Sequence, residues 1–559
     1  MTWRLPHGHD AHRVSRRRQW QWPALAGLVV VVLFNSGCIT TGAGQWFHNG
    51  FKVGPNYAKP PAPVAAEWIQ ANDPAVQNRH LEDWWQVFGD PTLNALIVTA
   101  YEQNPTLRIA GTRVLEARAG QAIAVGNIFP QTQQATGSYA RVNLNPNVPL
   151  FGAIANVLPP GERSLAFNNW FDGFNMSWEL DLWGRIRRNI ESNNASLDAS
   201  VEDYDAALVT LLADVATNYV QYRVAQQRIK IARDNVRIQE GVLALAEEKF
   251  RVGTTTKLDV EQARTVLEQT RSTIPSLQIA LGQANDTLCT LLGMPPRDLE
   301  PDLGPGPELG SKPMPSTPAW VATGIPADLL RRRPDVRSAE RHVAAQSAQI
   351  GVAEAALYPT IAINGFLGWD AADFSQFFET KSFIGAVFPS FSWNILNYGR
   401  IKNNVRLQVA KTQELIATYQ NTVLSAGREV QTPLRGFLRS REQADDLDRS
   451  VIAAKAATEL GVQQYRTGTI DFNRVFNLET TQVQQQDNLA VAAGNIALNL
   501  VNVYRALGGG WELRYQKEQL QRGTESEHGD ARRAPPEAPA ALGPERLPEA
   551  MPAPRPPIP

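Results

Sequence analysis

The sequence predicts a mainly α-helical chain in which one unit occurs twice and each copy also contributes two-faced β-structure. Three observations support this: a long-range internal repeat, sustained heptads of apolar residues, and stretches that alternate apolar and polar residues. The segments 107–130 and 336–359 align over their full length, and their final prolines are 229 residues apart. The turn glycines Gly253 and Gly468 are 215 residues apart. Two copies of one structural unit therefore form the body of the chain.

Each copy is expected to contain a helix, two strands, a very long helix, a tight turn and a returning helix. In the first copy, the first helix is expected at about 91–127 and the long helix at about 184–249. The returning helix ends near Leu292, before a glycine and two prolines. Because the repeat offset falls from 229 to 215 residues, we interpret 145–163 as an insertion in the first copy.

Alternating stretches predict four strands per chain. Residues 174–181 place apolar side chains on even positions and polar ones on odd positions, and 391–395 repeat this alternation in register. Residues 361–369 alternate as well, while 131–143 alternate weakly and are assigned from their repeat mate. Such strands have one apolar face and one polar face.

The strongest pattern is a heptad of apolar residues along the long helix of each copy. In the first copy the heptad consists of Leu208, Val215, Tyr222, Ile229, Val236, Leu243 and Phe250. In the second copy it consists of Val423, Val430, Phe437, Ala444, Val451, Thr458 and Tyr465. A sustained heptad predicts a left-handed supercoil, and a helix of this length measures about 100 Å.

Neither the strands nor the long helices can complete their structure within one chain. An open four-stranded sheet with an apolar face cannot sit in lipid, because its edges would leave backbone groups unpaired. The apolar stripe of each long helix also needs partners along its full length, and one hairpin supplies only part of them. We therefore expect several chains to close a barrel of strands and a barrel of helices, which together form a tube.

The N-terminus is expected to be a lipoprotein export signal. Arg16–Arg18 precede the apolar run 24–34, which is too short to span a bilayer. The run ends before Cys38, which we expect to carry covalent lipid, although Asn35 departs from the usual aliphatic residue. An ordinary signal with an incidental cysteine is the alternative. Cys289 is then a lone thiol, so no internal disulfide is expected.

Composition and charge argue against several functions. The formal net charge is −1, which gives no case for binding nucleic acid. The sequence has no phosphate-binding glycine loop and no paired cysteines, and His7, His9 and His12 lie in the expected signal. We therefore expect no enzymatic activity, no cofactor and no metal site. Residues 534–559 are rich in Pro, Ala and Glu, which predicts a disordered tail.

Several short motifs occur in a fixed order: Val53–Tyr57, Trp84-Trp85 with Phe88, Asp90-Pro91, Arg332–Asp335 and two Arg-x-Gly-Thr turns at 251–254 and 466–469. Together they resemble the TolC-type outer-membrane efflux channels, in particular the NodT-like lipoprotein branch that serves resistance-nodulation-division (RND) pumps. The resemblance covers about 52–513. It implies a homotrimer whose four strands per chain form a twelve-stranded outer-membrane β-barrel, continued by a periplasmic α-barrel with a mixed α/β equatorial region.

The resemblance also implies a passive channel that is lipid-anchored in the outer membrane and extends into the periplasm. An inner-membrane RND-type transporter supplies the energy, and a periplasmic adaptor connects the two. The chain then divides into a signal peptide at 1–37, an anchor and equatorial segment at 38–90, a first repeat at 91–300, a linker at 301–325, a second repeat at 326–513 and the tail at 514–559.

The resemblance places the adaptor-facing tips at the two hairpin turns. These are Arg251, Val252, Gly253 and Thr254 in the first copy, and Arg466, Thr467, Gly468 and Thr469 in the second. The family closes its periplasmic end with charged side chains near the tips. Arg466 matches an arginine used there, but the acidic position nine residues after Gly468 is Asn477 in this chain. Asp471 and Asp259 are therefore alternative candidates for the gate.

Two other functions remain open at this stage. A type I secretion exit duct would share the channel architecture. A periplasmic coiled-coil adaptor or envelope tether would explain the long hairpins, but it has no reason to carry amphipathic strands with Trp178 and Trp393.

Overall fold

The computed structural model describes residues 42–78, 82–143, 166–304 and 314–515. It divides into two compact units, Met1–Trp511 and Glu512–Pro559, and the second is described only as far as Tyr515. The expected signal peptide, Cys38, the expected insertion and nearly all of the expected tail lie outside the described residues.

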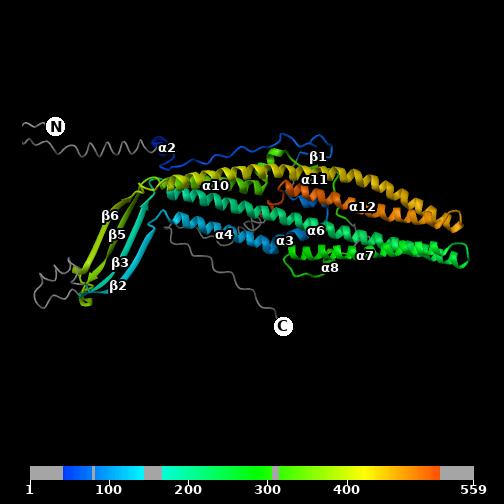
Figure 1. The fold of residues 1–559 in the computed structure, drawn as a ribbon, viewed down its shortest axis with the longest axis horizontal. Coiled ribbons are helices and arrows are strands. Elements are labelled where there is room, and N and C mark those ends of the chain that lie inside the picture. The colour runs from blue at the N-terminus through cyan, green and yellow to red at the C-terminus, as the bar shows by residue number, and fades with distance from the viewer. Residues whose placement is uncertain (1–41, 79–81, 144–165, 305–313, 516–559) are drawn as a thin grey trace, which may run out of the picture. The chain divides into compact units, whose positions relative to one another are not determined.

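Two very long helical hairpins form most of the first unit (Figure 1). Helix α6 (Arg185–Arg251) returns through α7 (Lys257–Leu291), and α11 (Arg400–Thr467) returns through α12 (Phe472–Ala506). Each long helix packs along its returning helix, and α6 also packs against α12. The predicted long helix at 184–249 and its second-copy counterpart are thus present, each about 100 Å long.

The single helix predicted at 91–127 is wrong, because the structure contains two. Helix α3 (Pro91–Gln103) ends at Asn104, and α4 (Pro105–Gly126) begins directly after it. Pro105 has no backbone N–H and disfavours a helical residue before it, so the helix cannot run through this point. The second copy has the corresponding α10 at Pro334–Ala355.

The two copies use equivalent joints to hold the ends of their returning helices. The Asn104 side chain donates a hydrogen bond of 2.8 Å to the carbonyl of Leu291, at the end of α7. In the second copy, the Arg333 guanidinium donates one of 2.9 Å to the carbonyl of Ala506, at the end of α12. Arg333 also pairs with Glu429 of α11 at 2.8 Å. Both joints satisfy carbonyls that a helix end leaves unpaired.

A four-stranded antiparallel sheet lies at one end of the unit, in the order β2-β3-β5-β6 (Figure 1). Its strands are β2 (Thr132–Asn143), β3 (Ala166–Leu180), β5 (Thr360–Ala371) and β6 (Phe383–Ser392). Strands β2 and β6 are its edges within the described residues. Four strands per chain were predicted, including the weakly alternating β2.

The strand predicted at 391–395 is displaced, because the structure places β6 earlier in the chain. Ser392 is the last residue of β6, and it pairs with Thr360, the first residue of β5. Among the described residues, 393–395 therefore have no neighbouring strand to pair with, although their side chains alternate. Pairing partners, rather than alternation, determine where this strand ends.

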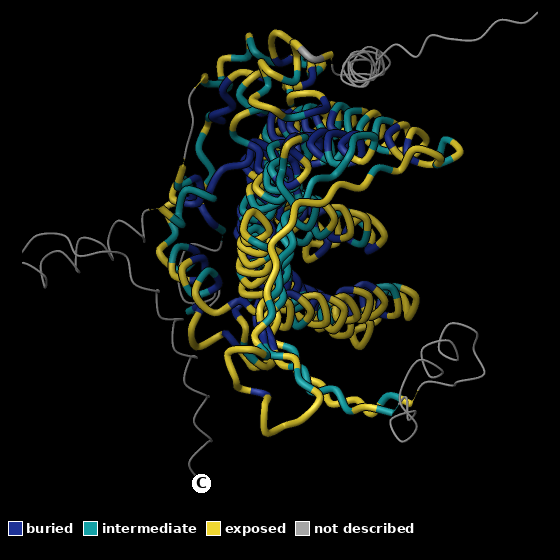
Figure 2. The backbone as a smooth tube through the Cα atoms, turned by 90° about the vertical axis from the view of Figure 1, so that its left-hand side faces the viewer, coloured by how far each residue is buried: buried dark blue, intermediate teal, exposed yellow. Residues whose placement is uncertain are grey.

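The predicted heptad of α6 is buried over only part of its length. Leu208 and Ile229 are buried, but Phe250 at the end of the same heptad is 47% exposed. The buried positions shift to Val242 and Ala246 in the last turns. An α-helix with 3.6 residues per turn drifts by about 20° per heptad, which rotates a strict seven-residue stripe out of the contact. In Figure 2 much of the buried backbone lies within the helical layers, whereas the strands of the four-stranded sheet are mostly half-buried or exposed.

The short elements of the first unit are α2 (Ala43–His48), β1 (Val76–Gln77), η1 (Trp84–Phe88), α8 (Glu300–Leu303), β4 (Val321–Ala322), η3 (Pro326–Asp328), α9 (Leu329–Arg332), η4 (Phe374–Gln376) and η5 (Thr380–Ser382). Strands β1 and β4 pair in parallel, so the segments that precede and follow the first repeat meet beside the long helices (Figure 1). Trp84 of η1 is fully buried and stacks on Tyr504, with ring centroids 5.8 Å apart.

Candidate functional site

One face of the four-stranded sheet is mostly apolar on β3, β5 and β6, where Asn168 and Asp172 of β3 are its polar members. Residues directly opposite one another on neighbouring strands share a face, and the register pairs Phe174 with Leu367 and Trp178 with Ile363. The same face carries Phe174, Met176, Trp178 and Leu180 of β3, Ile361, Ile363, Leu367 and Trp369 of β5, and Phe383, Val387 and Phe391 of β6. Phe174 is 59% exposed, so none of the described residues covers this face at its centre.

The opposite face carries polar side chains on all four strands, and they form hydrogen bonds between neighbouring strands. Asn175 donates to the Thr136 hydroxyl at 2.9 Å, and Ser177 donates to Asn364 at 2.8 Å. Asn364 in turn donates to the Ser390 hydroxyl at 2.7 Å. The sheet thus has one mostly apolar face and one more polar face, although Phe366 and Phe388 also lie on the second.

Strands β3 and β5 approach closely at a pair of glycines. Gly173 and Gly368 are register partners. A Cβ added at Gly368 would lie 2.3 Å from the carbonyl oxygen of Asp172 and 2.6 Å from the Cα of Gly173. No other residue fits this crossing without moving the backbone.

Two repeat-equivalent tryptophans join the sheet to the helices. The Trp178 indole donates to the carbonyl of Ile128, which follows α4, at 2.9 Å. The Trp393 indole donates to the carbonyl of Leu357, which follows α10, also at 2.9 Å. Trp178 corresponds to Trp393 in the repeat, and Ile128 corresponds to Leu357. The duplicated sequence therefore contains both partners of this contact twice.

The N-terminal motif Val53–Tyr57 seats the chain against α6 and α10. Gly54 has a left-handed φ of 82°, and a Cβ there would lie 2.4 Å from the Cα of Gly351 in α10. The buried Arg188 guanidinium donates to the carbonyls of Val53 and Gly54, each at 3.0 Å. Glycine is needed at both positions because the two backbones touch.

The two hairpin tips have the same backbone structure. Gly253 and Gly468 have φ values of 76° and 79°, in the left-handed region. In each tip the next threonine, Thr254 or Thr469, donates its backbone N–H over 2.9 Å to a carbonyl five residues earlier, which satisfies a helix end. A Cβ added at either glycine would meet no other part of the chain within 4 Å. The backbone conformation, and not internal packing, therefore requires glycine at each tip.

All of the predicted tip residues are exposed, namely Arg251, Val252, Gly253, Thr254, Arg466, Thr467, Gly468 and Thr469. Behind them the two hairpins pack together. Buried Tyr465 of α11 contacts Phe472 of α12, with ring centroids 5.5 Å apart, and both join a cluster that includes Ala246 and Val260 of the first hairpin. The Lys249 ammonium lies 4.9 Å from the Tyr465 ring centroid. Burial raises the pKa of the Tyr465 hydroxyl.

The gate candidates are close in sequence, but the structure gives them separate local roles. The carboxylate of Asp471 caps α12 by accepting from the backbone N–H of Arg474 at 3.1 Å. Asp259 forms a capping box with Thr256 at the start of α7. Asn477 donates to a carbonyl of its own helix. Arg466 is exposed, and its side chain forms no hydrogen bond or ion pair within the described part of the chain.

Polar contacts that sequence reasoning missed connect the first hairpin to the second. Arg228 of α6 and Asp487 of α12 form two parallel hydrogen bonds of 2.7 and 2.9 Å. Asn235 of α6 donates to Gln486 of α12 at 2.8 Å. These partners are about 250 residues apart in the chain and carry no sequence signal of their pairing.

No cluster of three or more His, Cys, Asp or Glu side chains could hold a metal ion in the described ranges. No helix in this part of the chain is both long enough and apolar enough to cross a membrane.

Comparisons with known proteins give a consistent family. The family model described as "Outer membrane efflux protein" matches residues 96–294 and 325–509. The pyoverdine export outer membrane protein OpmQ of Pseudomonas putida is 30% identical over 434 residues, which cover 77% of this chain and 88% of that protein. The probable outer membrane lipoprotein SilC of Salmonella typhimurium is 27% identical over 462 residues, covering 82% and 95%.

Among solved structures, the outer-membrane channel OprN is 33% identical, with a TM-score of 0.75 over 82% of this chain and 99% of that one. The match to the family model extends over both repeats, including the four strands of the sheet and the hairpin tips. The chain therefore belongs to the outer membrane efflux protein family.

Proposed function

We propose that three copies of the chain form the outer-membrane channel of a tripartite efflux pump. The channel passively conducts small molecules that an inner-membrane RND-type transporter expels through a periplasmic adaptor. Several relatives align with this chain over most of their own length. One is a toluene efflux pump outer membrane protein of Pseudomonas putida, which is 30% identical to it. The chain itself performs no reaction in this proposal.

The two-faced sheet is the observation that carries the proposal. Its apolar face suits lipid and its polar face suits a water-filled interior. Its edge strands β2 and β6 leave a row of backbone groups unpaired within the described chain, which costs several kcal/mol per group in hydrocarbon. Pairing β2 of one copy with β6 of the next removes every edge. Three copies then supply twelve strands.

Adjacent residues on opposite faces of β3 provide the test. Met176→Arg places a charge on the proposed lipid face, where it costs about 2–4 kcal/mol near the bilayer centre. Ser177→Arg places the same charge on the proposed water face. We expect Met176→Arg to lose membrane insertion, and Ser177→Arg to insert as a trimer with altered single-channel conductance. Equal effects of the two changes, or a wild-type protein that purifies as a soluble monomer, would contradict the proposed barrel.

We also propose that the exposed tips dock the adaptor. The tips are exposed, and the shared cluster around Tyr465 and Phe472 packs the two hairpins together behind them. The double variant Gly253→Phe with Gly468→Phe adds bulk where the chain itself has open space, at a backbone cost of about 1–2 kcal/mol per site. We expect drug export to be lost while the trimer persists.

The control for tip docking is Gly427→Phe, since Gly427 lies within α11 and also has open space around it. This variant should export normally. Wild-type export by the double tip variant, at normal surface level, would count against docking at the tips.

The proposed gate uses Arg466. Because Asp471 and Asp259 already cap their own helices, a lock through Arg466 would have to form with another copy of the chain. Single-channel conductance of Arg466→Ala decides this. Higher conductance than wild type is expected, and unchanged conductance would remove Arg466 from the gate.

The proposed lipid anchor is Cys38. The probable lipoprotein SilC supports it by name, and an acyl group would reinforce a protein that the barrel already holds. Labelling with a palmitate analogue should mark the wild type and not Cys38→Ser. An unlabelled wild type would end this part of the proposal.

A deletion strain separates small-molecule efflux from type I secretion. We expect sensitivity to dyes, antibiotics, bile salts or metal ions when the protein is absent. A defect confined to one secreted protein would instead favour the exit duct.

A further inference from the structure

We propose that residues 42–51 form a membrane foot, in which Phe47 and Phe51 insert into the boundary between phospholipid headgroups and acyl chains, in the leaflet nearer the helices. Its large aromatic residues are Trp46, Phe47 and Phe51. The inference rests on the outer-membrane location proposed above. It adds a bilayer contact outside the strands and independent of the acyl group.

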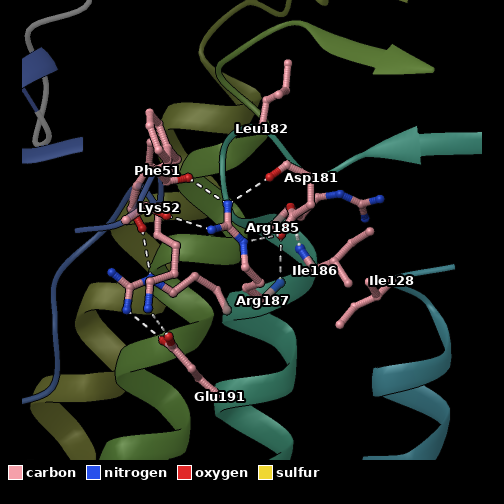
Figure 3. A network of polar contacts seen from close by, with 12 residues as sticks. Phe51, Lys52, Ile128, Asp181, Leu182, Arg185, Ile186, Arg187 and Glu191 are labelled. Carbon is pink, nitrogen blue, oxygen red and sulfur yellow. Dashed lines mark hydrogen bonds and ion pairs between the residues drawn. The ribbon is translucent and has the colours of Figure 1, made fainter. Parts of the chain in front are cut away.

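The membrane foot lies where the apolar face of the sheet ends. The Trp46 indole donates to the carbonyl of Leu182 at 3.3 Å, and its ring lies 5.4 Å from that of Trp183. Leu182 follows Leu180, the last residue of β3, by two positions. Figure 3 shows Phe51 and Leu182 at this junction. The membrane foot therefore continues the surface that the proposed barrel presents to lipid.

The aromatic side chains of the membrane foot are exposed together. Phe47 is 65% exposed and Phe51 is 44% exposed, and their rings are in edge contact at 5.4 Å. Phe51 also contacts Trp46, with centroids 4.8 Å apart. The segment 42–51 contains no Asp, Glu, Lys or Arg. Exposed aromatic rings are favoured at the bilayer interface and are costly to leave in water.

The backbone holds Phe51 outward against its own conformational preference. Gly50 and Phe51 have φ values of 65° and 61°, and the left-handed region is unfavourable for a phenylalanine. The Phe51 N–H donates to the Trp46 carbonyl at 2.8 Å. Arg187 donates to the carbonyls of Gly50 at 2.6 Å and Phe51 at 2.9 Å, and it is itself held by Asp181 (Figure 3). Strained residues that several contacts fix in place mark functional positions.

The position of Cys38, just before the membrane foot, indicates that lipid, and not a second copy of the chain, covers its aromatic side chains. Cys38 is four residues before Gly42. Four residues span at most about 14 Å when fully extended. An acyl group on Cys38 would therefore enter the bilayer beside Phe47, and the two would anchor the same point of the molecule.

Spin labels at three comparably exposed positions test the membrane foot. The variants are Phe47→Cys, Val387→Cys on the apolar sheet face and Leu258→Cys at the start of α7, which are 65%, 75% and 66% exposed as wild type. Each full-length protein is reconstituted into phosphatidylethanolamine–phosphatidylglycerol vesicles. Accessibility to oxygen, which concentrates in lipid, is compared with accessibility to a water-soluble nickel chelate. Wild-type protein, in which Cys289 is buried, gives the background.

We expect the oxygen-to-nickel ratio at position 47 to approach that at 387 and to exceed that at 258. A ratio at 47 equal to that at 258 would place the membrane foot in water and overturn the inference. Low accessibility to both reagents at 47 would mean a protein contact, which also overturns it. A lipid signal at 387 with a water signal at 47 rejects only the membrane foot. The reverse result keeps the membrane foot and rejects the barrel.

Discussion

Replacing Glu479 with glutamine tests how burial of a carboxyl group controls the stability of the second hairpin. Glu479 lies in α12 and is 3% exposed, and its Oε1 atom has no hydrogen-bond partner among the described residues. Burial raises the pKa of this carboxyl from its usual 4.5 to about 7, and no charged neighbour contributes to the shift. The folded hairpin therefore favours the protonated acid.

The sign of the pH dependence follows from this raised pKa. Below pH 4.5 the Glu479 carboxyl is protonated in both the packed and the open hairpin, and its contribution to stability is fully present. Between about 4.5 and 7 the packed state binds more protons than the open state, so stability falls as pH rises. Above pH 7 the loss is complete. From pH 5 to pH 8 the free energy of opening should fall by about 2–3 kcal/mol, or roughly 70-fold in the opening constant.

Hydrogen exchange of the α12 backbone amides measures this opening directly, after correction for the intrinsic exchange rate at each pH. Wild-type protein should open more readily at pH 8 than at pH 5. Glu479→Gln should abolish most of this difference, because glutamine stays neutral and similar in shape. Glu459→Gln on α11 is the matched control, since Glu459 is exposed, and it should keep the wild-type pH dependence. Equal pH dependence in wild type and Glu479→Gln would refute the reasoning.

Three further changes probe the joints of the fold. Arg333→Ala should destabilise the end of α12 by about 2 kcal/mol, as measured by hydrogen exchange. Arg333→Lys should not restore this stability, because one ammonium group cannot reach all the acceptors of a guanidinium. Gly368→Ala should lower the yield of protease-resistant protein. Gly385→Ala is the control and should be tolerated, because the added Cβ would lie no closer than 3.4 Å to another atom. Equal yields of the two variants would contradict the close crossing. A double-mutant cycle on Arg228 and Asp487 should give a coupling free energy of about 0.5–1 kcal/mol, since both side chains are about one-third exposed. A coupling of zero would mean that the pair does not hold the hairpins together.

The internal repeat made the architecture readable from sequence. Equivalent prolines and glycines delimit helices of nearly equal length in both copies, because their effects on φ and on hydrogen bonding are local. The two-residue alternation identified the apolar face around Phe174 and Trp178 for the same reason, since side-chain direction in a strand depends only on position. The tip glycines were likewise evident, because a left-handed φ restricts the residue type.

Tertiary structure decided the features that depend on partners distant in the chain. The end of β6 at Ser392 depends on where β5 begins, and the exposure of Phe250 depends on accumulated helix drift against a neighbour. The bond between Arg228 and Asp487 and the strained turn at Phe51 depend on contacts more than a hundred residues away. Local sequence determines conformational preference, but burial and pairing are properties of the assembled layers, and only the folded chain sets them.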